Sequence, residues 1–485
     1  MPAGKTLFDV EFAADLLSVT KQTILSWIDA GKLKPVSSDA YGNSLFNWKA
    51  FSSFPQVADM DERKWKEFSA ISPKRKYTSI ELFAGGGGLA LGLEKAGFNH
   101  ILLNEFMPEA CETLRRNRPD WNVVEGDVSK IDFRHLKGKV DVVSGGFPCQ
   151  AFSYAGHRAG FEDARGTLFF EFARVVKETQ PMMFIGENVR GLLTHDNGKT
   201  IATIKSVIAD IGYELVDPKI LKAIFYRVPQ KRERLLLIGV RKDLAQHFSF
   251  NWPAKASRIY TVRDALKKGE LFPCDVPLSD GQKYPKRKAE ILAMVPPGGY
   301  WRDLPLDVQK EYMKKSFYLG GGKTGMARRL SWNAPSLTLT CAPAQNQTER
   351  CHPEESRPLT VREYARIQTF PDEWQFAGSQ SVQYKQIGNA VPVNLAYAVG
   401  LSVIDALNRL PISNKVSRTI GFDYKETTQR MLPMTQLRLA IEKKKGYTVK
   451  ENGTADRGTK SKSVSSKKPA TKRTKSVKAG YGKRG

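Results

Sequence analysis

The chain has 485 residues, a length that fits roughly three domains of about 150 residues each. Apolar residues make up 41% and aromatic residues 10%, so the chain can bury a core and is not wholly disordered. No apolar run reaches the roughly 18 residues that a membrane span needs, and the N-terminus does not continue into a signal peptide. Five scattered cysteines form neither a disulfide framework nor a zinc site. We therefore expect a reduced, soluble protein inside the cell that uses no metal.

Charge is the most informative part of the composition. Lys and Arg number 76 against 50 Asp and Glu, a net charge of +26. Residues 441–485 contain 15 basic and 3 acidic residues, which gives +12 and leaves +14 for the first 440 residues. A basic balance outside the tail favours a polyanionic partner, nucleic acid before membrane. On charge alone, a basic tail on an unrelated enzyme is the alternative.

The first 58 residues have the pattern of a small helical module. Apolar residues three and four apart predict an amphipathic helix over 11–17, and Thr20 is a good N-cap for a second helix over 21–30. A short hairpin is expected next. This layout resembles the winged helix-turn-helix of excisionases and of the MerR type. The residues that would open its recognition helix and contact bases are Lys21, Gln22 and Thr23. A helical hairpin with no DNA role is the alternative.

A second region shows the alternation of an α/β protein. Apolar strands are predicted over 79–84, 100–104, 140–145, 182–186 and 235–240. Strands that alternate with helical stretches favour a doubly wound, mostly parallel sheet.

The composition also suggests where the chain divides. The segment 250–356 is rich in Pro, Gly, Trp and Lys and predicts a smaller, loop-rich domain, and the Lys/Ser/Thr/Gly-rich tail predicts disorder. The predicted divisions are a module over 1–58, a polar linker over 59–76, the α/β region over 77–249, the loop-rich domain over 250–356, a returning α/β part over 357–410, an extension over 411–442 and the tail over 443–485.

A glycine-rich loop follows the first predicted strand. Gly85, Gly87 and Ala90 satisfy the pattern G-x-G-x-x-A at a strand-to-helix junction, where small residues let a ligand approach the backbone. Two acids, Glu105 and Asp127, follow the next strands, and a carboxylate after the second strand commonly holds ribose hydroxyls. The loop alone is equally typical of NAD, FAD and S-adenosylmethionine sites. Each acid taken alone is as readily explained as a solvated loop residue.

Three further groups of polar residues lie at strand ends. Cys149 stands in P-C-Q at 148–150, just past an apolar strand, at the edge where open α/β sheets bind ligands. A lone cysteine is more often a small buried hydrophobe, but the neighbours of this one are polar. The sequence E-N-V at 187–189 ends a later strand, and Q-x-R-x-R at 230–234 precedes another. Guanidinium groups there suit phosphate or carbonyl oxygens.

Together and in this order, these motifs resemble the DNA cytosine-5-methyltransferases. The family shows F-A-G-x-G-G, P-C-Q, E-N-V, Q-x-R-x-R and, late in the chain, G-N-x-V, which stands here at 388–391. The sequence R-P-L-T-V-R-E at 357–363 is similar to the family's penultimate block. The resemblance covers about residues 78–405 and makes 250–356 the variable target-recognition domain. It implies a Rossmann-like methyltransferase that uses S-adenosylmethionine to methylate carbon 5 of a cytosine flipped out of duplex DNA.

The resemblance also implies roles for single residues. Cys149 adds to carbon 6 of the ring, Glu187 meets ring N3 and favours its protonation, and Arg234 touches ring O2. Arg232 steadies the loop that carries the nucleophile. The implied cofactor contacts are Phe83, Gly85, Gly87, Glu105, Asp127, Pro148 and Asn389. Ser153 belongs to the loop that closes over the flipped base in the family, and the basic candidates for groove contacts are Lys323, Arg328, Arg329 and Arg350.

Three alternatives stay open. One branch of the same family methylates tRNA, although the long 250–356 segment and the N-terminal module favour double-stranded DNA as the partner. A repressor with an inert methyltransferase core is the second, and a dehydrogenase is the third, for which nothing provides a hydride site. We expect a bacterial cytoplasmic enzyme that is monomeric during methylation, with a restriction endonuclease encoded nearby and a helix-turn-helix that is a candidate for control of its own promoter.

Overall fold

The computed structural model describes residues 7–17, 19–38, 42, 44–147, 168–319 and 323–411. All of them belong to one compact unit that spans Met1–Val416. Cys149 with its neighbours Pro148 and Ser153, and the predicted tail over 443–485, lie outside the described residues.

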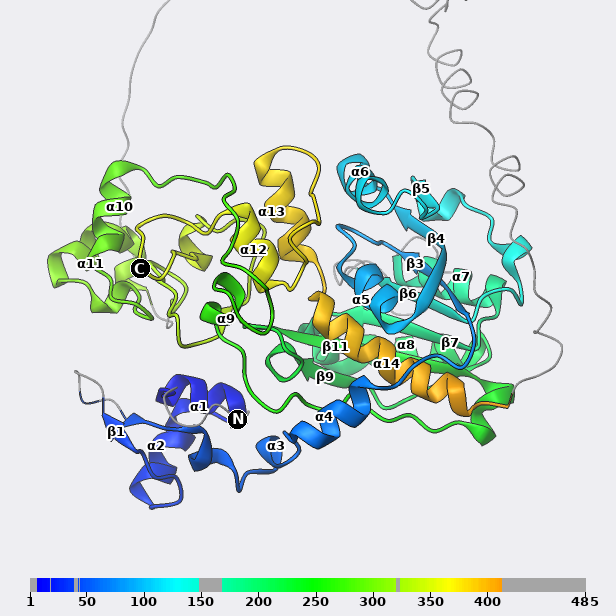
Figure 1. Cartoon of the computed structure of the whole chain (residues 1–485), viewed down its shortest axis with the longest axis horizontal. Helices are drawn as coiled ribbons and strands as arrows, with labels where there is room; N and C mark the ends of the chain where they lie inside the picture. Colours follow the sequence, from blue (N-terminus) through cyan, green and yellow to red (C-terminus); the bar gives the residue numbers. More distant parts are fainter. Residues whose placement is uncertain are drawn as a thin grey trace, which may run out of the picture. The chain divides into compact units, whose positions relative to one another are not determined.

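An eight-stranded mixed sheet forms the centre of the fold (Figure 1). Its parallel strands lie in the order β5 (Val123–Glu125), β4 (Phe98–Glu105), β3 (Tyr77–Leu82), β6 (Val142–Gly146) and β7 (Met183–Asn188). Antiparallel to β7 runs β11 (Glu233–Arg241), which also pairs with β8 (Tyr213–Leu215) and β9 (Lys219–Lys222). Each of the five predicted strands is present, and the sheet is rich in parallel pairs as expected. The chain reverses its direction of winding between β3 and β6, and open α/β sheets bind ligands at such a switch point.

Helices cover the sheet, and one of them comes from the last part of the described chain. The helices that connect the strands are α5 (Gly88–Ala96), α6 (Pro108–Asn117), α7 (Leu168–Thr179) and α8 (Lys199–Asp210). The returning part adds α12 (Val361–Ile367), α13 (Gln380–Asn389) and α14 (Val393–Arg409). α14 packs closely on α5, because a Cβ at Gly92 would lie 2.3 Å from Ala396 Cβ. The helical stretch 380–409 is long and apolar enough to cross a membrane, but 83% of its most apolar window is buried inside the protein, which is the position of a core helix.

The N-terminal module has the predicted elements. They are α1 (Val10–Leu17), α2 (Lys21–Asp29) and a hairpin of β1 (Ser37–Ser38) and β2 (Ser44–Leu45), followed by the short α3 (Pro55–Ala58). Thr20 caps α2, because its side chain accepts a hydrogen bond of 3.0 Å from Thr23 N. The elements therefore agree with the pattern, while DNA reading by this module stays a prediction.

The segment 59–76 is not the polar linker that its composition predicts. It contains α4 (Glu62–Ser69), which begins at the N-cap Asp61. Trp65 of this helix is 6% exposed and shares a hydrophobic cluster with Ala256 and Tyr260. The charged residues that dominate the composition lie on the other face of the helix, so composition alone misses the buried one.

The segment 250–356 is loop-rich, as expected, and contains α9 (Val262–Leu266), α10 (Lys286–Ala293) and α11 (Leu306–Met313). It also contains β12 (Ser336–Leu337), which pairs in parallel with β10 (Gln230–Lys231). Leu292 and Trp301 belong to a small hydrophobic core of its own. α9, however, is buried in the same cluster as Trp374 of the returning part. α9 therefore packs with the returning α/β part.

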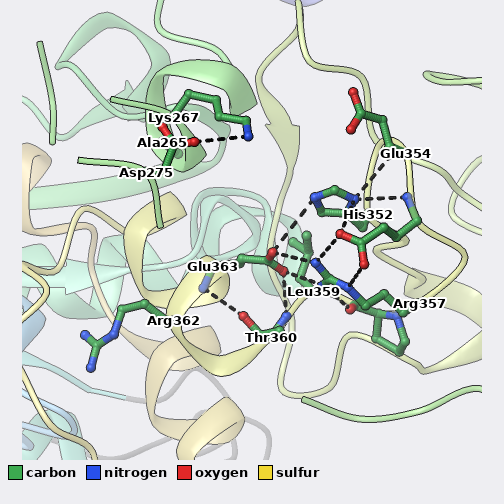
Figure 2. Close-up of polar contacts among 12 residues, drawn as sticks. Ala265, Lys267, Asp275, His352, Glu354, Arg357, Leu359, Thr360, Arg362 and Glu363 are labelled. Atoms are coloured by element: carbon green, nitrogen blue, oxygen red, sulfur yellow. Dashed lines mark hydrogen bonds and ion pairs between the residues drawn. The ribbon is translucent and has the colours of Figure 1, made fainter. Parts of the chain in front are cut away.

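The block R-P-L-T-V-R-E joins this segment to α12 (Figure 2). Arg357 donates from both terminal nitrogens to the Glu363 carboxylate, at 2.8 and 2.9 Å, and also pairs with Glu355. Glu363 accepts from Thr360 N at 2.7 Å, which completes a capping box at the start of α12. His352 Nε2 lies 3.9 Å from Glu363. The block thus fixes the end of the loop-rich segment to the first helix of the returning part.

Candidate active site

The glycine loop and Glu105 meet at the switch point of the sheet. The Glu105 carboxylate accepts from Gly85 N at 2.8 Å and from Met107 N at 2.8 Å, so it links the loop after β3 to the start of α6. Phe83 has a φ of 58°, a left-handed conformation that strains a residue with a side chain. Such strain is typical of functional sites.

The loop has the shape of a ligand cradle. Gly85 has a φ of +54° and nothing within 4 Å of a Cβ placed on it, so a ligand meets bare backbone there. Gly87, the N-cap of α5, has no side chain to cap the helix, and a Cβ there would lie 2.8 Å from Leu114 and Trp374. The first turn of α5 therefore offers backbone N–H groups. Together with the Glu105 carboxylate, these groups fit a nucleoside cofactor.

Two more predicted cofactor residues have partners of their own. Asp127 accepts from Ser129 Oγ at 2.8 Å and Ser129 N at 3.0 Å, and these hydrogen bonds lower the pKa of Asp127. Asn389 is exposed at the end of α13 and accepts a hydrogen bond of 3.2 Å from the Cys341 thiol.

Sequence reasoning missed one residue at this site. Phe106 directly follows Glu105 and is 72% exposed, although a large aromatic side chain is usually covered. An aromatic residue after the acid that ends the second strand is a signal that the sequence does contain.

The second half of the site is an ion pair between neighbouring strands. Arg234 Nε of β11 lies 2.6 Å from Glu187 Oε1 of β7, and both side chains are largely buried. Arg234 also donates to Glu233 O at 2.8 Å. A buried pair of this kind is costly to break from one side, so each residue holds the other in place.

This ion pair lies beside the end of β6, where the P-C-Q segment begins. A Cβ on Gly146 would lie 2.7 Å from Glu187 Oε2, so only a glycine leaves room for the carboxylate. Asn188 donates from Nδ2 to Phe147 O at 2.7 Å. Residues of E-N-V therefore contact the last two described residues before Pro148. The structure describes nothing of Cys149 itself.

Arg232 is almost fully buried and ties three parts of the chain together. It donates to Leu339 O at 3.1 Å and to Gly388 O at 2.8 Å, with a longer contact of 3.4 Å to Asn389 O. Burial lowers the pKa of the Arg232 guanidinium. Among the described residues, Arg232 thus holds the G-N-x-V block against β12 and its continuation. Its expected contact with the nucleophile loop involves residues outside the described part.

A cavity of about 430 Å³ opens beside these residues. Its lining includes Val189, the basic residues Arg190, Lys222, Lys231, Arg232 and Arg234, and one acid, Glu233. The volume and the basic lining suit a nucleotide that has left a duplex.

The candidates for DNA contact are divided by the structure. Arg329 donates to Leu292 O at 2.6 Å and to His352 O at 3.0 Å, and Arg350 donates to Glu349 O at 2.7 Å. Both are buried. We therefore correct their expected role: these guanidinium groups satisfy backbone carbonyls inside the segment.

The remaining described candidates differ in their exposure. Lys323 donates to the carbonyls of Ser316 and Leu319. Arg328 is 9% exposed and lies 5.7 Å from the centre of the Tyr300 ring. The side chains of Lys21 and Gln22 are exposed at the start of α2.

Comparisons with known proteins agree with this geometry. The family model of the C-5 cytosine-specific DNA methylases matches residues 77–405. The type II methyltransferase M.Eco47II of Escherichia coli is 62% identical over 84% of this chain and 97% of its own length. M.Sau96I of Staphylococcus aureus is 46% identical over 82% of this chain and 87% of its own length. The crystal structure of a DNA modification methyltransferase encoded within an E. coli prophage is similar with a TM-score of 0.54, at 27% identity over 69% of this chain and all of that one.

A glycine cradle lies on one side of the switch point of the sheet and a buried Glu–Arg pair on the other, and together with the comparisons this places the chain among the DNA methyltransferases. The chain belongs to the C-5 cytosine-specific DNA methylase family. Its activity is the methylation of carbon 5 of cytosine in DNA.

Proposed function

We propose that this enzyme is the modification methyltransferase of a bacterial restriction–modification system and that Cys149 forms a covalent adduct with the target cytosine. The single observation that carries the mechanism is the Glu187–Arg234 pair, 2.6 Å apart and next to the end of β6. Relatives at 46–62% identity over most of the chain carry the name type II methyltransferase, which supports the assignment to a modification system.

The reaction needs a nucleophile because carbon 5 of cytosine is too electron-poor to attack a methyl group unaided. A Cys149 thiolate adds to carbon 6 and makes carbon 5 nucleophilic, which divides one difficult step into easier ones. Glu187 holds a proton at ring N3 and neutralises the charge that arrives on the ring. Arg234 orients Glu187 and donates to ring O2. After methyl transfer, the carbon 5 proton is lost to solvent, its bonding electrons restore the carbon 5–carbon 6 double bond, and the carbon 6–sulfur bond breaks to expel the Cys149 thiolate.

The cofactor we assign is S-adenosylmethionine, which supplies the electrophilic methyl group when bound. The glycine cradle fits its close approach, and the Glu105 carboxylate at the end of β4 is placed for its ribose hydroxyls. Phe106 directly follows Glu105 and is exposed, and Phe83 stands just before the glycine loop, so these two rings suit the two sides of an adenine ring. Asp127 is assigned to the adenine amine, and Asn389 with Pro148 to the amino-acid end.

The base must leave the helix before it reaches this site. Inside a duplex the cytosine is stacked between its neighbours, so Cys149 cannot reach its carbon 6. The cytosine is therefore rotated out into the cavity of about 430 Å³. Ser153, in the segment after the nucleophile, is assigned to the loop that closes over it. Bisulfite sequencing of DNA from a host that expresses the protein tests the function. Protected cytosines at one recurrent sequence are expected, and random or absent protection would contradict specific cytosine methylation.

A second role is suggested by the N-terminal module. Its two helices, capped by Thr20, and its hairpin have the layout of a DNA-reading fold. We propose that Lys21, Gln22 and Thr23 face DNA. The proposal also includes control of the gene's own promoter by this module. It further includes a nearby endonuclease gene, a cytoplasmic location and a monomeric enzyme. A reporter gene under the native promoter, with and without the protein, tests the regulatory part.

A further inference from the structure

A groove of about 780 Å³ lies between the N-terminal module and the loop-rich segment. Lys21 and Leu25 of α2 line one side, and 296–300 with 328–331 line the other. Lys231 lines this groove and also the cavity that contains Arg232 and Arg234. The groove and the cavity for the base therefore share a wall.

The module is held beside this groove by contacts with the catalytic part. Lys231 Nζ lies 5.8 Å from the centre of the Phe12 ring of α1. Lys255 Nζ donates to Gln56 O at 2.7 Å, and Trp65 of α4 packs with residues 256 and 260. The buried residues of α1 and α2 belong to the same hydrophobic cluster as β7 and β11. These contacts hold the module, and α2 with it, beside the groove.

The charges in the groove point to a polyanion on the α2 side. Lys21 is exposed in the first turn of α2, where the backbone N–H groups and the helix dipole also favour a negative group. Three acids line the groove as well: Asp9 caps α1 by accepting from Phe12 N at 2.7 Å, Asp303 accepts from Tyr300 N at 2.7 Å, and Glu11 lies in the first turn of α1. The carboxylates of Asp9 and Asp303 are thus engaged with backbone, whereas Lys21 is an exposed cation in the lining of the groove.

We propose that α2 and the loop-rich segment grip one and the same duplex, so that Lys21 contacts a phosphate of the DNA whose cytosine is methylated. The N-terminal module then forms the second wall of the target cleft. This inference rests on the DNA methylation of the family and is independent of the proposed promoter control.

Methylation kinetics of Lys21→Ala on a duplex that contains the site found by bisulfite sequencing test the inference. The KM for this duplex should rise roughly three- to tenfold at an unchanged kcat, and the slope of log K against log salt should fall by about 0.9. Lys34→Ala is the matched control, because Lys34 is exposed on the same module but does not line the groove. Shortening the duplex from one end should remove the difference between wild type and Lys21→Ala.

Two results would overturn the inference. One is a KM and a salt slope of Lys21→Ala equal to those of wild type and Lys34→Ala. The other is a loss of DNA binding by Lys21→Ala that appears only on duplexes without the methylated site, while its KM for the target duplex equals that of wild type. Equal thermal unfolding of the two variants and wild type shows that the comparison concerns binding, and methylation by wild type shows that the proposed function holds independently.

Discussion

Glu187 and Arg234 are bound to each other at 2.6 Å across the antiparallel junction of β7 and β11. Glu187 also fills the space beside Gly146, the last residue of β6. The pair therefore connects the end of β6, which precedes the P-C-Q segment, with the start of β11, which lies in the sequence Q-x-R-x-R.

Replacing Arg234 by alanine should lower kcat/KM by at least about 100-fold, because Glu187 loses the partner that orients it and ring O2 loses a donor. Steady-state methylation of the target duplex measures this. Arg241→Ala is the control, since Arg241 stands at the other end of β11 and pairs with Asp243. Near-normal activity of Arg234→Ala would remove the pair from the mechanism.

Replacing Phe106 by alanine should weaken binding of S-adenosylmethionine by about three- to tenfold, because a stacking surface beside Glu105 is lost. Titration calorimetry gives the Kd directly. Leu278→Ala removes a fully exposed apolar side chain elsewhere and should leave the Kd unchanged. An unaltered Kd in Phe106→Ala would mean that the exposed ring does not touch the cofactor.

Stability should depend on pH through Glu81, a buried carboxyl of β3 that accepts from Ser144 Oγ at 3.3 Å. Burial raises the pKa of Glu81 from 4.5 to about 8. Between these values the folded state keeps a proton that the unfolded state has lost, so the free energy of unfolding falls as pH rises, by up to about 1.4 kcal/mol per pH unit.

Urea unfolding between pH 5 and pH 8 tests this account of Glu81. Glu81→Gln should flatten the decline, because a neutral amide has no proton to lose. Glu112→Gln changes an exposed carboxylate that pairs with Arg116 and should follow wild type. Parallel curves for Glu81→Gln and wild type would show that Glu81 does not cause the dependence.

Deleting the tail from Lys443 should reduce the slope of log K against log salt by roughly two to five units, because dispersed lysines and arginines contact phosphates. The methylated cytosine should stay the same, since phosphate contacts carry no sequence information. A tail of equal length with Gln in place of Lys and Arg should behave like the deletion. An unchanged slope would identify a tail without a role in DNA binding.

The sequence predicts the catalytic half of the molecule well, for a physical reason. The parallel strands are continuous apolar runs that a local pattern detects, and the carboxyl ends of such strands meet at one edge of the sheet. The glycine loop after β3 and Glu105 at the end of β4 meet at that edge through a hydrogen bond of 2.8 Å, while their contact with a cofactor stays a prediction.

Other features depend on tertiary contacts that a local pattern does not contain. Arg329 and Arg350 look like surface cations in a polar segment. Both are buried, and their guanidinium groups donate to backbone carbonyls of the surrounding loops. Trp65 stands among charged residues in the sequence of α4, and its burial comes from packing against Ala256 and Tyr260. The groove at Lys21 exists only because residues about 300 positions apart form its two sides.

Cys149 is proposed to form a covalent adduct with the target cytosine, and that adduct can be trapped. A target duplex with 5-fluorocytosine at the methylated position, incubated with enzyme and S-adenosylmethionine, should give a stable protein–DNA adduct, because fluorine cannot leave as a proton does. Peptide mass spectrometry should place the adduct on Cys149, and Cys149→Ser should form none while still binding the cofactor. An adduct on another residue, or methylation by Cys149→Ser above a few per cent of wild type, would contradict the account.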